Sequence, residues 1–171
     1  FYKMLPTKVY FYALFIVLTV ARRSVACKDG FSLKLNKIEN CAGPDGVITL
    51  SDDTAITLGE DCSLSMQGCV KLKEFNTAAG SVSVSKNGRE MFKKQIDACK
   101  MGSKIPFVKD FLPGGLCPQS DGQICADPDK KLPMDRFKKM LGIMKGSIGI
   151  ELNLDHDTGK SCIKMEVEIS K

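Results

Sequence analysis

The chain has 171 residues, of which 43% are hydrophobic and 26% are charged, with eight cysteines, one histidine and no tryptophan. This length fits one domain with a substantial core, and the composition excludes a disordered chain, a collagen and a polytopic membrane protein. Residues 1–26 hold four of the 25 basic residues and none of the 20 acidic ones, so the remainder is nearly neutral. A neutral body argues against a nucleic-acid partner, because binding to phosphates needs a surplus of cations.

Residues 1–26 have the pattern of a secretory signal peptide. The apolar run at 9–18 follows two lysines and is shorter than the roughly 20 residues that a membrane span needs. Small residues, Ser24 and Ala26, stand third and first before Cys27, as they do at a signal cleavage site. The segment therefore predicts export from the cytoplasm.

A membrane anchor and a bacterial lipoprotein signal are two other interpretations of this segment. The residues that end at Cys27 resemble the end of a lipobox, but Arg22 and Arg23 stand where that box has apolar residues. We therefore expect residues 27–171 to form a single domain, secreted to the extracellular space or to the endolysosomal lumen.

All eight cysteines lie at or after Cys27, and an even number behind a secretory signal predicts disulfides. Eight cysteines allow on the order of a hundred pairings, so the sequence leaves the connectivity open. A zinc site would need closer pairs than Cys62 with Cys69 or Cys117 with Cys125, and one histidine is available. No metal and no cofactor is therefore expected.

Apolar and polar residues alternate along much of the chain after residue 30, which is typical of half-buried strands. This alternation predicts strands at 31–35, 64–66, 82–84, 148–154 and 163–169. Turn signals separate these segments: Gly-Pro-Asp-Gly at 43–46, Lys-Asn-Gly at 86–88 and Asp-Thr-Gly at 157–159. Short strands with frequent turns predict an all-β antiparallel sandwich.

Two stretches break the alternation. Residues 99–125 include Phe107 and Phe111 among charged residues, and they predict a short helical turn or an apolar loop rather than a strand. Residues 134–141 predict another short helix. Either both are ordinary connections that cover the core, or they form the mouth of a cavity as an apolar flap whose ends are held by cysteines.

Catalytic motifs are weak in this sequence. The triplet at 157–159 matches the aspartic proteases, but that reaction needs two such carboxylates, and a hairpin turn explains the residues. The segment 159–161 lacks the earlier glycine of a P-loop. His156 is expected to be solvated in the same turn, and Glu166 with Glu168 to lie on the wet face of a strand. The chain is therefore expected not to be an enzyme.

The remaining distinctive feature of the sequence is its set of methionine and phenylalanine residues. Seven methionines lie after residue 27, and phenylalanines cluster at Phe107, Phe111 and Phe137. Methionine fills irregular space and recurs on adaptable apolar surfaces. These side chains either pack a solid core or line a cavity between the sheets, and the composition alone leaves both open.

Three segments resemble the ML lipid-recognition family: Asn40-Cys41, residues 114–118 (GGLCP) and residues 160–164 (KSCIK). The stretch from Cys62 to Cys99 is similar in strand spacing to the ganglioside activators of that family, and the resemblance spans about residues 31–169. It implies an immunoglobulin-like sandwich of two antiparallel sheets that holds a lipid in an internal apolar cavity.

The resemblance also carries implications for the cysteines. It implies a disulfide between Cys41 and Cys162, which join the first and last strands. Cys117 is similar to the family cysteine that precedes a proline, and Cys125 to the region of its nearby partner. The partners of the other four stay open: Cys27, Cys62, Cys69 and Cys99.

These expectations favour a carrier or lipid-presenting accessory protein for lipid transport, which holds a fatty acid, sterol or glycolipid chain by desolvation. Its partners would be the lipid or another hydrophobic small molecule, a membrane surface, and a receptor or enzyme that receives the lipid. Lys104 and Lys109 either meet an acidic headgroup at the mouth of the cavity or are a pair of solvated lysines. The expected lining residues are Leu64, Met66, Val82, Val84, Phe107, Phe111, Met134, Phe137, Ile150, Leu152 and Met165.

The alternative is a secreted protein-interaction module, such as a receptor co-factor or an inhibitor. It has the same disulfides and sandwich but a solid core and an exposed apolar patch. An apolar void between the sheets that reaches solvent near residues 104–116 would distinguish the carrier from this module.

Overall fold

The computed structural model describes residues 26–102, 115–134 and 138–171. The expected signal peptide, apart from Ala26, lies outside these residues, and so do Lys104, Phe107, Lys109, Phe111 and Phe137. In the part of the chain that is described, no helix is long and apolar enough to cross a membrane.

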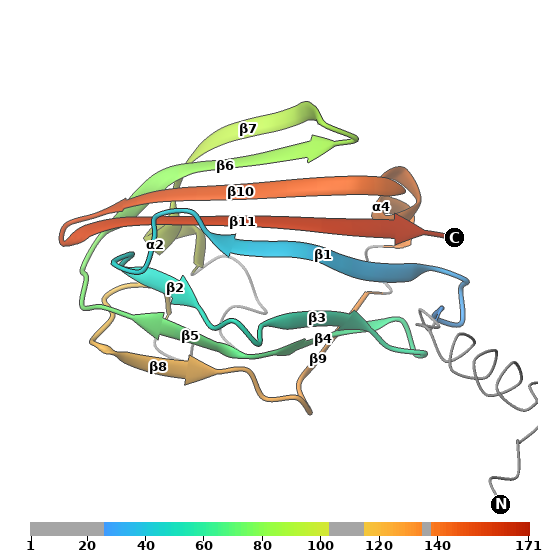
Figure 1. Ribbon diagram of the computed structural model, residues 1–171, viewed down its shortest axis with the longest axis horizontal. Helices are drawn as coiled ribbons and strands as arrows, with labels where there is room; N and C mark the ends of the chain where they lie inside the picture. Colours follow the sequence, from blue (N-terminus) through green and yellow to red (C-terminus); the bar gives the residue numbers. More distant parts are fainter. Residues whose placement is uncertain (1–25, 103–114, 135–137) are drawn as a thin grey trace, which may run out of the picture.

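A five-stranded antiparallel sheet forms one layer of the molecule (Figure 1). Its strands, in spatial order, are β1 (Ser32–Asn40), β11 (Gly159–Ser170), β10 (Gly146–His156), β6 (Ala78–Lys86) and β7 (Arg89–Asp97). Strand β10 pairs with β11 along its whole length, and its alternate residues Ile148 and Leu154 are buried. Side chains alternate across a strand, so one face of this sheet supplies the core and the other meets water.

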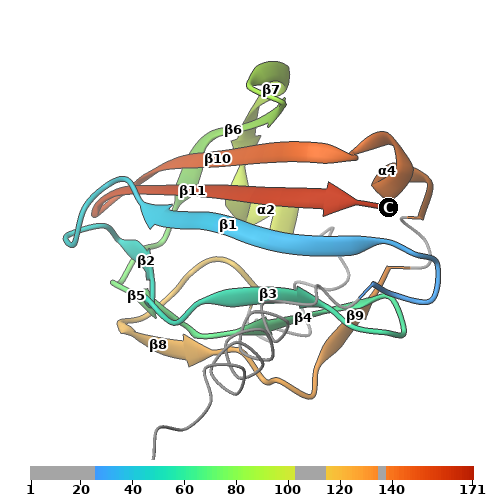
Figure 2. The ribbon, with the colours of Figure 1, turned by 45° about the vertical axis from the view of Figure 1, so that its right-hand side comes forward.

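Six shorter strands form the second layer, as two three-stranded sheets that follow one another along it (Figures 1 and 2). One sheet contains β2 (Ile48–Leu50), β5 (Cys69–Leu72) and β8 (Gly122–Cys125), and the other β3 (Ala55–Leu58), β4 (Ser63–Gln67) and β9 (Lys131–Pro133). Gly68 separates β4 from β5 with a φ of +97°. A Cβ at this position would lie 2.7 Å from the Cα of Thr54, so glycine permits the close approach of the two segments.

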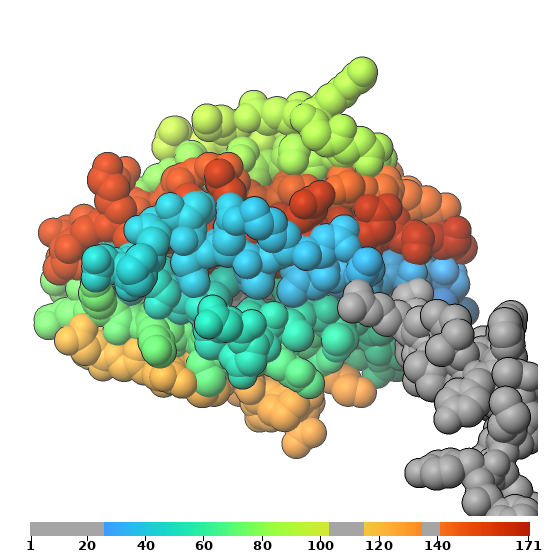
Figure 3. Space-filling model, in the orientation of Figure 1, coloured from blue at the N-terminus to red at the C-terminus, as the bar shows by residue number. Residues whose placement is uncertain are grey.

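Strand β1 closes one long edge of the sandwich against β2 and β3 (Figure 3). The side chain of Asn40 donates from Nδ2 to the carbonyl of Leu50 (2.9 Å) and accepts at Oδ1 from the amide of Leu50 (2.8 Å). The amide of Ile48 donates to Oγ of Ser161 in β11 (2.8 Å). These bonds satisfy backbone groups at the edge of β2 and join the two layers.

The prediction of an all-β antiparallel sandwich is confirmed. Apart from Phe31, the five alternating segments lie within β1, β4, β6, β10 and β11. Strand β7 has no apolar–polar alternation because its first seven residues are all exposed. The remaining five strands, which have three or four residues each, are too short for a period of two to stand out.

The predictions for the two stretches that break the alternation agree with the structure to different degrees. The helix expected at 134–141 overlaps α4 (Lys138–Ile143). The stretch 99–125 contains most of α2 (Ala98–Gly102), but it also contains strand β8. The expectation of no strand there is wrong, because backbone pairing with β5 holds this segment extended.

Four disulfides join the eight cysteines. Cys41 bonds with Cys162, which is the pair that the resemblance implies. It ties the end of β1 to β11. The bond between Cys27 and Cys62 ties the first described residues to the start of β4.

Cys117 bonds with Cys99, and Cys125 bonds with Cys69. The implied partnership of Cys117 with the region of Cys125 is therefore wrong. The register between β5 and β8 places Cys69 opposite Cys125, with their Cα atoms 3.9 Å apart, and this pairing of distant segments selects the bond.

The core consists of two clusters near opposite ends of β10. The first cluster contains Cys27, Phe31, Leu58, Cys62, Leu141, Ile148, Val167 and Ile169. The second cluster contains Val47, Phe75, Ala78, Ala98 and Leu154. Apolar residues outside these clusters, such as Val70 and Val82, are half-buried.

Candidate functional site: an apolar pocket on the inner face

A pocket of about 310 Å³ lies against the sheet β2-β5-β8. The register places Ile48 opposite Leu72, and Leu50 and Ile124 on either side of Val70, so these five side chains share one face. Two of them, Ile48 and Leu72, pack against the second core cluster. The shared face is therefore the one that faces the five-stranded sheet.

The lining of the pocket is apolar, and none of the described residues that line it is charged. Its polar side chains are Thr54, Gln67 and Gln119. Thr54 Oγ1 donates to the carbonyl of Ser51 (2.6 Å), and Gln119 Nε2 donates to the carbonyl of Gly115 (2.7 Å). Because the protein itself engages the donors of Thr54 and Gln119, the pocket favours an apolar guest over a polar one.

The segment 115–119 forms one wall of the pocket through Leu116 and Gln119. The amide of Gln119 donates to the carbonyl of Phe75 (2.8 Å), and the amide of Phe75 donates to the carbonyl of Gln119 (3.1 Å). The disulfide from Cys117 to Cys99 ties the same segment to α2. A backbone bridge and a covalent bond therefore hold this wall in place.

The turn between β10 and β11 closes the end of the sandwich near Phe75. The carboxylate of Asp157 accepts from the amides of Asn76 (2.9 Å) and Thr77 (3.2 Å) and from Nδ2 of Asn76 (3.0 Å). These hydrogen bonds lower the pKa of Asp157 to about 2, and the bond from the Asn76 side chain has the largest effect on that pKa. The triplet at 157–159 is thus the turn of a hairpin, and its carboxylate fastens the segment that leads into β6.

His156 is half-buried, and the expectation that it is solvated is wrong. Its ring centroid lies 4.4 Å from that of Phe75, and its Nε2 lies 2.8 Å from Oγ of the buried Ser161. Burial lowers the pKa of His156, although the charges of Asp157 and Asp155 oppose this effect. The turn folds back onto the segment at Phe75, a contact between residues about 80 positions apart that local sequence does not reveal.

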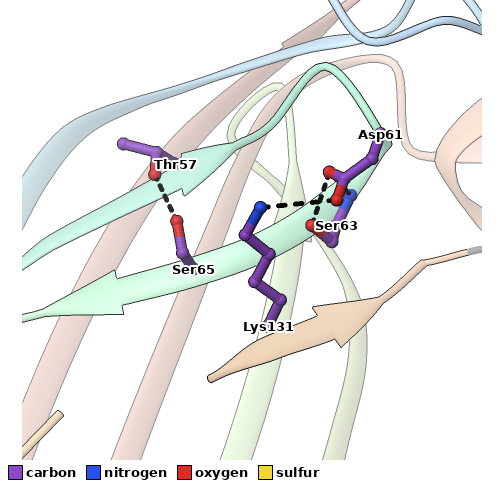
Figure 4. Close-up of polar contacts among 5 residues, drawn as sticks. All are labelled: Thr57, Asp61, Ser63, Ser65 and Lys131. Atoms are coloured by element: carbon purple, nitrogen blue, oxygen red, sulfur yellow. Dashed lines mark hydrogen bonds and ion pairs between the residues drawn. The ribbon is translucent and has the colours of Figure 1, made fainter. Parts of the chain in front are cut away.

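The other end of the second layer carries an exposed polar network, shown in Figure 4. Oδ1 of Asp61 accepts from Oγ of Ser63 (2.5 Å) and from its amide (3.1 Å), and Nζ of Lys131 in β9 lies 3.5 Å from Oδ2. These contacts, led by the hydroxyl of Ser63, lower the pKa of Asp61 to about 2. The hydroxyls of Thr57 and Ser65 lie 2.7 Å apart across β3 and β4. The network links three strands outside the pocket.

One residue of the expected lining set, Met66, lines this pocket. Five others pack against the first core cluster: Leu64, Val84, Met134, Ile150 and Met165. Leu152 packs against the second cluster, and Val82 is half-buried on β6. Phe107, Phe111 and Phe137 lie outside the described residues. A role of the expected set in ligand binding stays a prediction.

Sequence reasoning missed the five residues that form the floor of the pocket: Ile48, Leu50, Val70, Leu72 and Ile124. The tripeptides ITL and VKL do alternate, but three residues are too few for alternation to distinguish a strand from chance. The signal that would find them is their pairing across β2, β5 and β8, and this pairing is a property of the fold.

A second hollow of about 430 Å³ lies on the outer face of the five-stranded sheet. Its lining is rich in serine and in charged residues. Lys164 lies 3.5 Å from Glu151, and Lys37 forms an ion pair with Glu39. These charges pair with one another and are exposed to solvent. They would therefore contribute less to the affinity for a ligand than the apolar pocket does.

The fold and the pocket define a class of protein: a disulfide-linked β-sandwich with an apolar hollow against its inner face. No protein-family model matches the chain. The chain is 28% identical over 162 residues to a protein of Anopheles gambiae named sporozoite-associated mosquito saliva protein 1, and the match covers 91% of this chain and 90% of that protein. A relative in saliva and four disulfides together point to an extracellular, secreted protein.

Proposed function

We propose that the chain is a secreted lipid carrier or lipid-presenting accessory protein that holds the hydrocarbon part of a lipid between its two layers. The observation that supports this most strongly is the pocket of about 310 Å³, with apolar walls and no charged residue among those described. Pockets for small molecules usually measure about 300–1,000 Å³. Each CH2 group that moves from water into such a pocket contributes about 0.8 kcal/mol.

Two further observations support the same proposal. The pocket lies beside the second core cluster, which supplies Phe75 to its lining and against which Ile48 and Leu72 pack, so its walls join an apolar interior. The cysteine and strand pattern resembles the ML lipid-recognition family, and that resemblance implies a lipid between two sheets. The proposal assigns no reaction to the chain, and a protein-interaction module with a solid core is the function that the test must distinguish from it.

The proposal is tested on the secreted, disulfide-bonded protein. An organic extract is analysed for lipids by mass spectrometry, and binding of a fluorescent fatty acid is titrated in solution. We expect the extract to contain lipid and Val70→Trp, which fills the pocket, to weaken binding at least tenfold, about 1.4 kcal/mol. Lys71→Trp is the matched control, because Lys71 is the exposed next residue on the opposite face of β5.

Recovery of no lipid together with no fatty-acid binding would refute the carrier. Equal binding by the two tryptophan variants would show that lipid binds away from this pocket. A urea unfolding curve for each variant shows whether loss of binding reflects loss of the fold.

A further inference from the structure

The β6–β7 hairpin forms the edge of the five-stranded sheet that lies away from the second layer (Figures 1 and 2). The first seven residues of β7 are exposed. In the space-filling view the hairpin is a ridge along the top of the molecule (Figure 3). The turn at Asn87 and Gly88, where both residues have positive φ, joins its two strands and matches the twist of a tight hairpin.

Two large apolar side chains of this hairpin stand in solvent. Met91 is 58% exposed and Phe92 is 46% exposed. Nearby, Ile143 at the end of α4 is 64% exposed, and its carbonyl accepts from Nζ of Lys86 at the start of the turn (2.5 Å). These are the three most exposed large apolar residues in the described part of the chain. Large apolar side chains that are exposed on neighbouring elements are candidates for an interaction surface.

The same hairpin carries a concentrated positive charge. Residues 86–94 contain four basic residues and one acidic residue: Lys86, Arg89, Lys93, Lys94 and Glu90. The chain after residue 26 is nearly neutral as a whole, so residues 86–94 are more basic than the chain on average. Apolar side chains on a hairpin that also carries lysine and arginine are complementary to an anionic bilayer, where the cations meet headgroups and the apolar groups enter the interface.

We propose that the β6–β7 hairpin docks the protein on bilayers that contain anionic lipid. This role rests on the proposed function, because a carrier must meet the membrane from which it takes its lipid. The register supports the link, since Phe92 lies opposite Val84 and Lys94 opposite Val82. The hairpin face that bears Phe92 is therefore continuous with the apolar inner face of the sheet.

Two protein partners fit this surface less well. A partner strand that extends the sheet would pair with the backbone of β7, and lysines at an edge, here Lys93 and Lys94, oppose such pairing. A second copy of the chain would bring two clusters of basic residues together. Charge complementarity therefore favours the bilayer.

The test is flotation of the full disulfide-bonded protein with vesicles. One vesicle type is phosphatidylcholine alone, and the other contains about one third phosphatidylserine. We expect flotation with the anionic vesicles, little with the neutral ones, and weaker binding at higher salt. Equal flotation with both vesicle types, or with neither, would overturn the proposal.

Two double variants test the hairpin itself. Lys93→Ser with Lys94→Ser is expected to weaken vesicle binding about 30-fold, because each basic residue near an anionic surface strengthens binding about fivefold. Met91→Ser with Phe92→Ser is expected to weaken it about tenfold. The controls alter exposed residues elsewhere: Lys28→Ser with Lys71→Ser removes the same charge, and Met101→Ser removes an exposed methionine on α2.

Loss of flotation in the controls to the same extent would overturn the assignment to the hairpin. A concentration-dependent dimer that only the hairpin variants abolish in sedimentation would also overturn it, because the surface would then bind a second copy. Failure of docking is separable from failure of the carrier function. The hairpin variants should bind fluorescent fatty acid in the absence of vesicles, whereas Val70→Trp should float but not bind.

Discussion

The five-stranded sheet and the second layer of the sandwich differ in the length of their strands. The strands of the five-stranded sheet have nine to twelve residues, and Ile148 in its central strand, β10, is fully buried. The strands of the second layer have three to five residues and leave a hollow over Val70 and Ile124. Long strands thus supply a continuous wall, and short interrupted strands leave apolar surface available to a guest.

The largest difference between regions of the molecule is expected in the loss of unfolding free energy when single disulfides are removed. Cys41→Ser with Cys162→Ser opens a link between residues 121 apart and should cost about 5 kcal/mol of unfolding free energy. Cys99→Ser with Cys117→Ser opens a link between residues 18 apart and should cost about 3 kcal/mol. Urea unfolding of both variants measures the difference.

The same two variants should rank in the opposite order for binding. Cys117 holds the wall that contains Leu116, so loss of its bond should weaken fatty-acid binding more than loss of the Cys41–Cys162 bond. Equal losses of binding in the two variants would contradict the assignment of segment 115–119 to the pocket wall.

Matched truncations of isoleucine compare the closed wall with the hollow. Ile148→Ala removes a fully buried side chain and should destabilise the fold by about 4 kcal/mol. Ile124→Ala removes a half-buried one beside the pocket and should cost about 1 kcal/mol. Unfolding free energies that fall equally would indicate that Ile124 lies in a packed core and that the hollow is filled.

Low pH should destabilise both regions, because each contains one carboxylate that the folded protein holds in its charged form. Asp61 and Asp157 have pKa values lowered from 3.8 to about 2 in the folded state. The folded protein therefore binds fewer protons than the unfolded chain, so the contribution is complete above about pH 4 and is lost as the pH falls towards 2. Asp61→Asn and Asp157→Asn should each flatten the fall of the melting temperature in this range.

Ser63→Ala provides a sharper version of that test. The hydroxyl of Ser63 is the main cause of the low pKa of Asp61, so its removal should raise that pKa and leave the pKa of Asp157 unchanged. Titration of the carboxyl groups by NMR measures both. A pKa of Asp61 near 3.8 in the unmodified protein would contradict the hydrogen-bond network of Figure 4.

The parts of the molecule that sequence predicts are those with long local patterns. Ile148 to Leu154 alternate over seven residues, and the turn at 86–88 has the residues that its positive φ angles require. The pocket residues Val70 and Ile124 have no such pattern, because they belong to four-residue strands. Their common face exists only once β5 pairs with β8.

The sequence by itself determined the all-β class and the abundance of disulfides, because alternation, turn residues and cysteine number are local or compositional properties. The tertiary structure alone decided three other matters: the pairing of Cys69 with Cys125, the burial of His156 against Phe75, and the position of the apolar pocket. Each of these depends on a contact between segments about 50 or more residues apart. Such contacts follow from how two layers pack, and no short stretch of the chain records them.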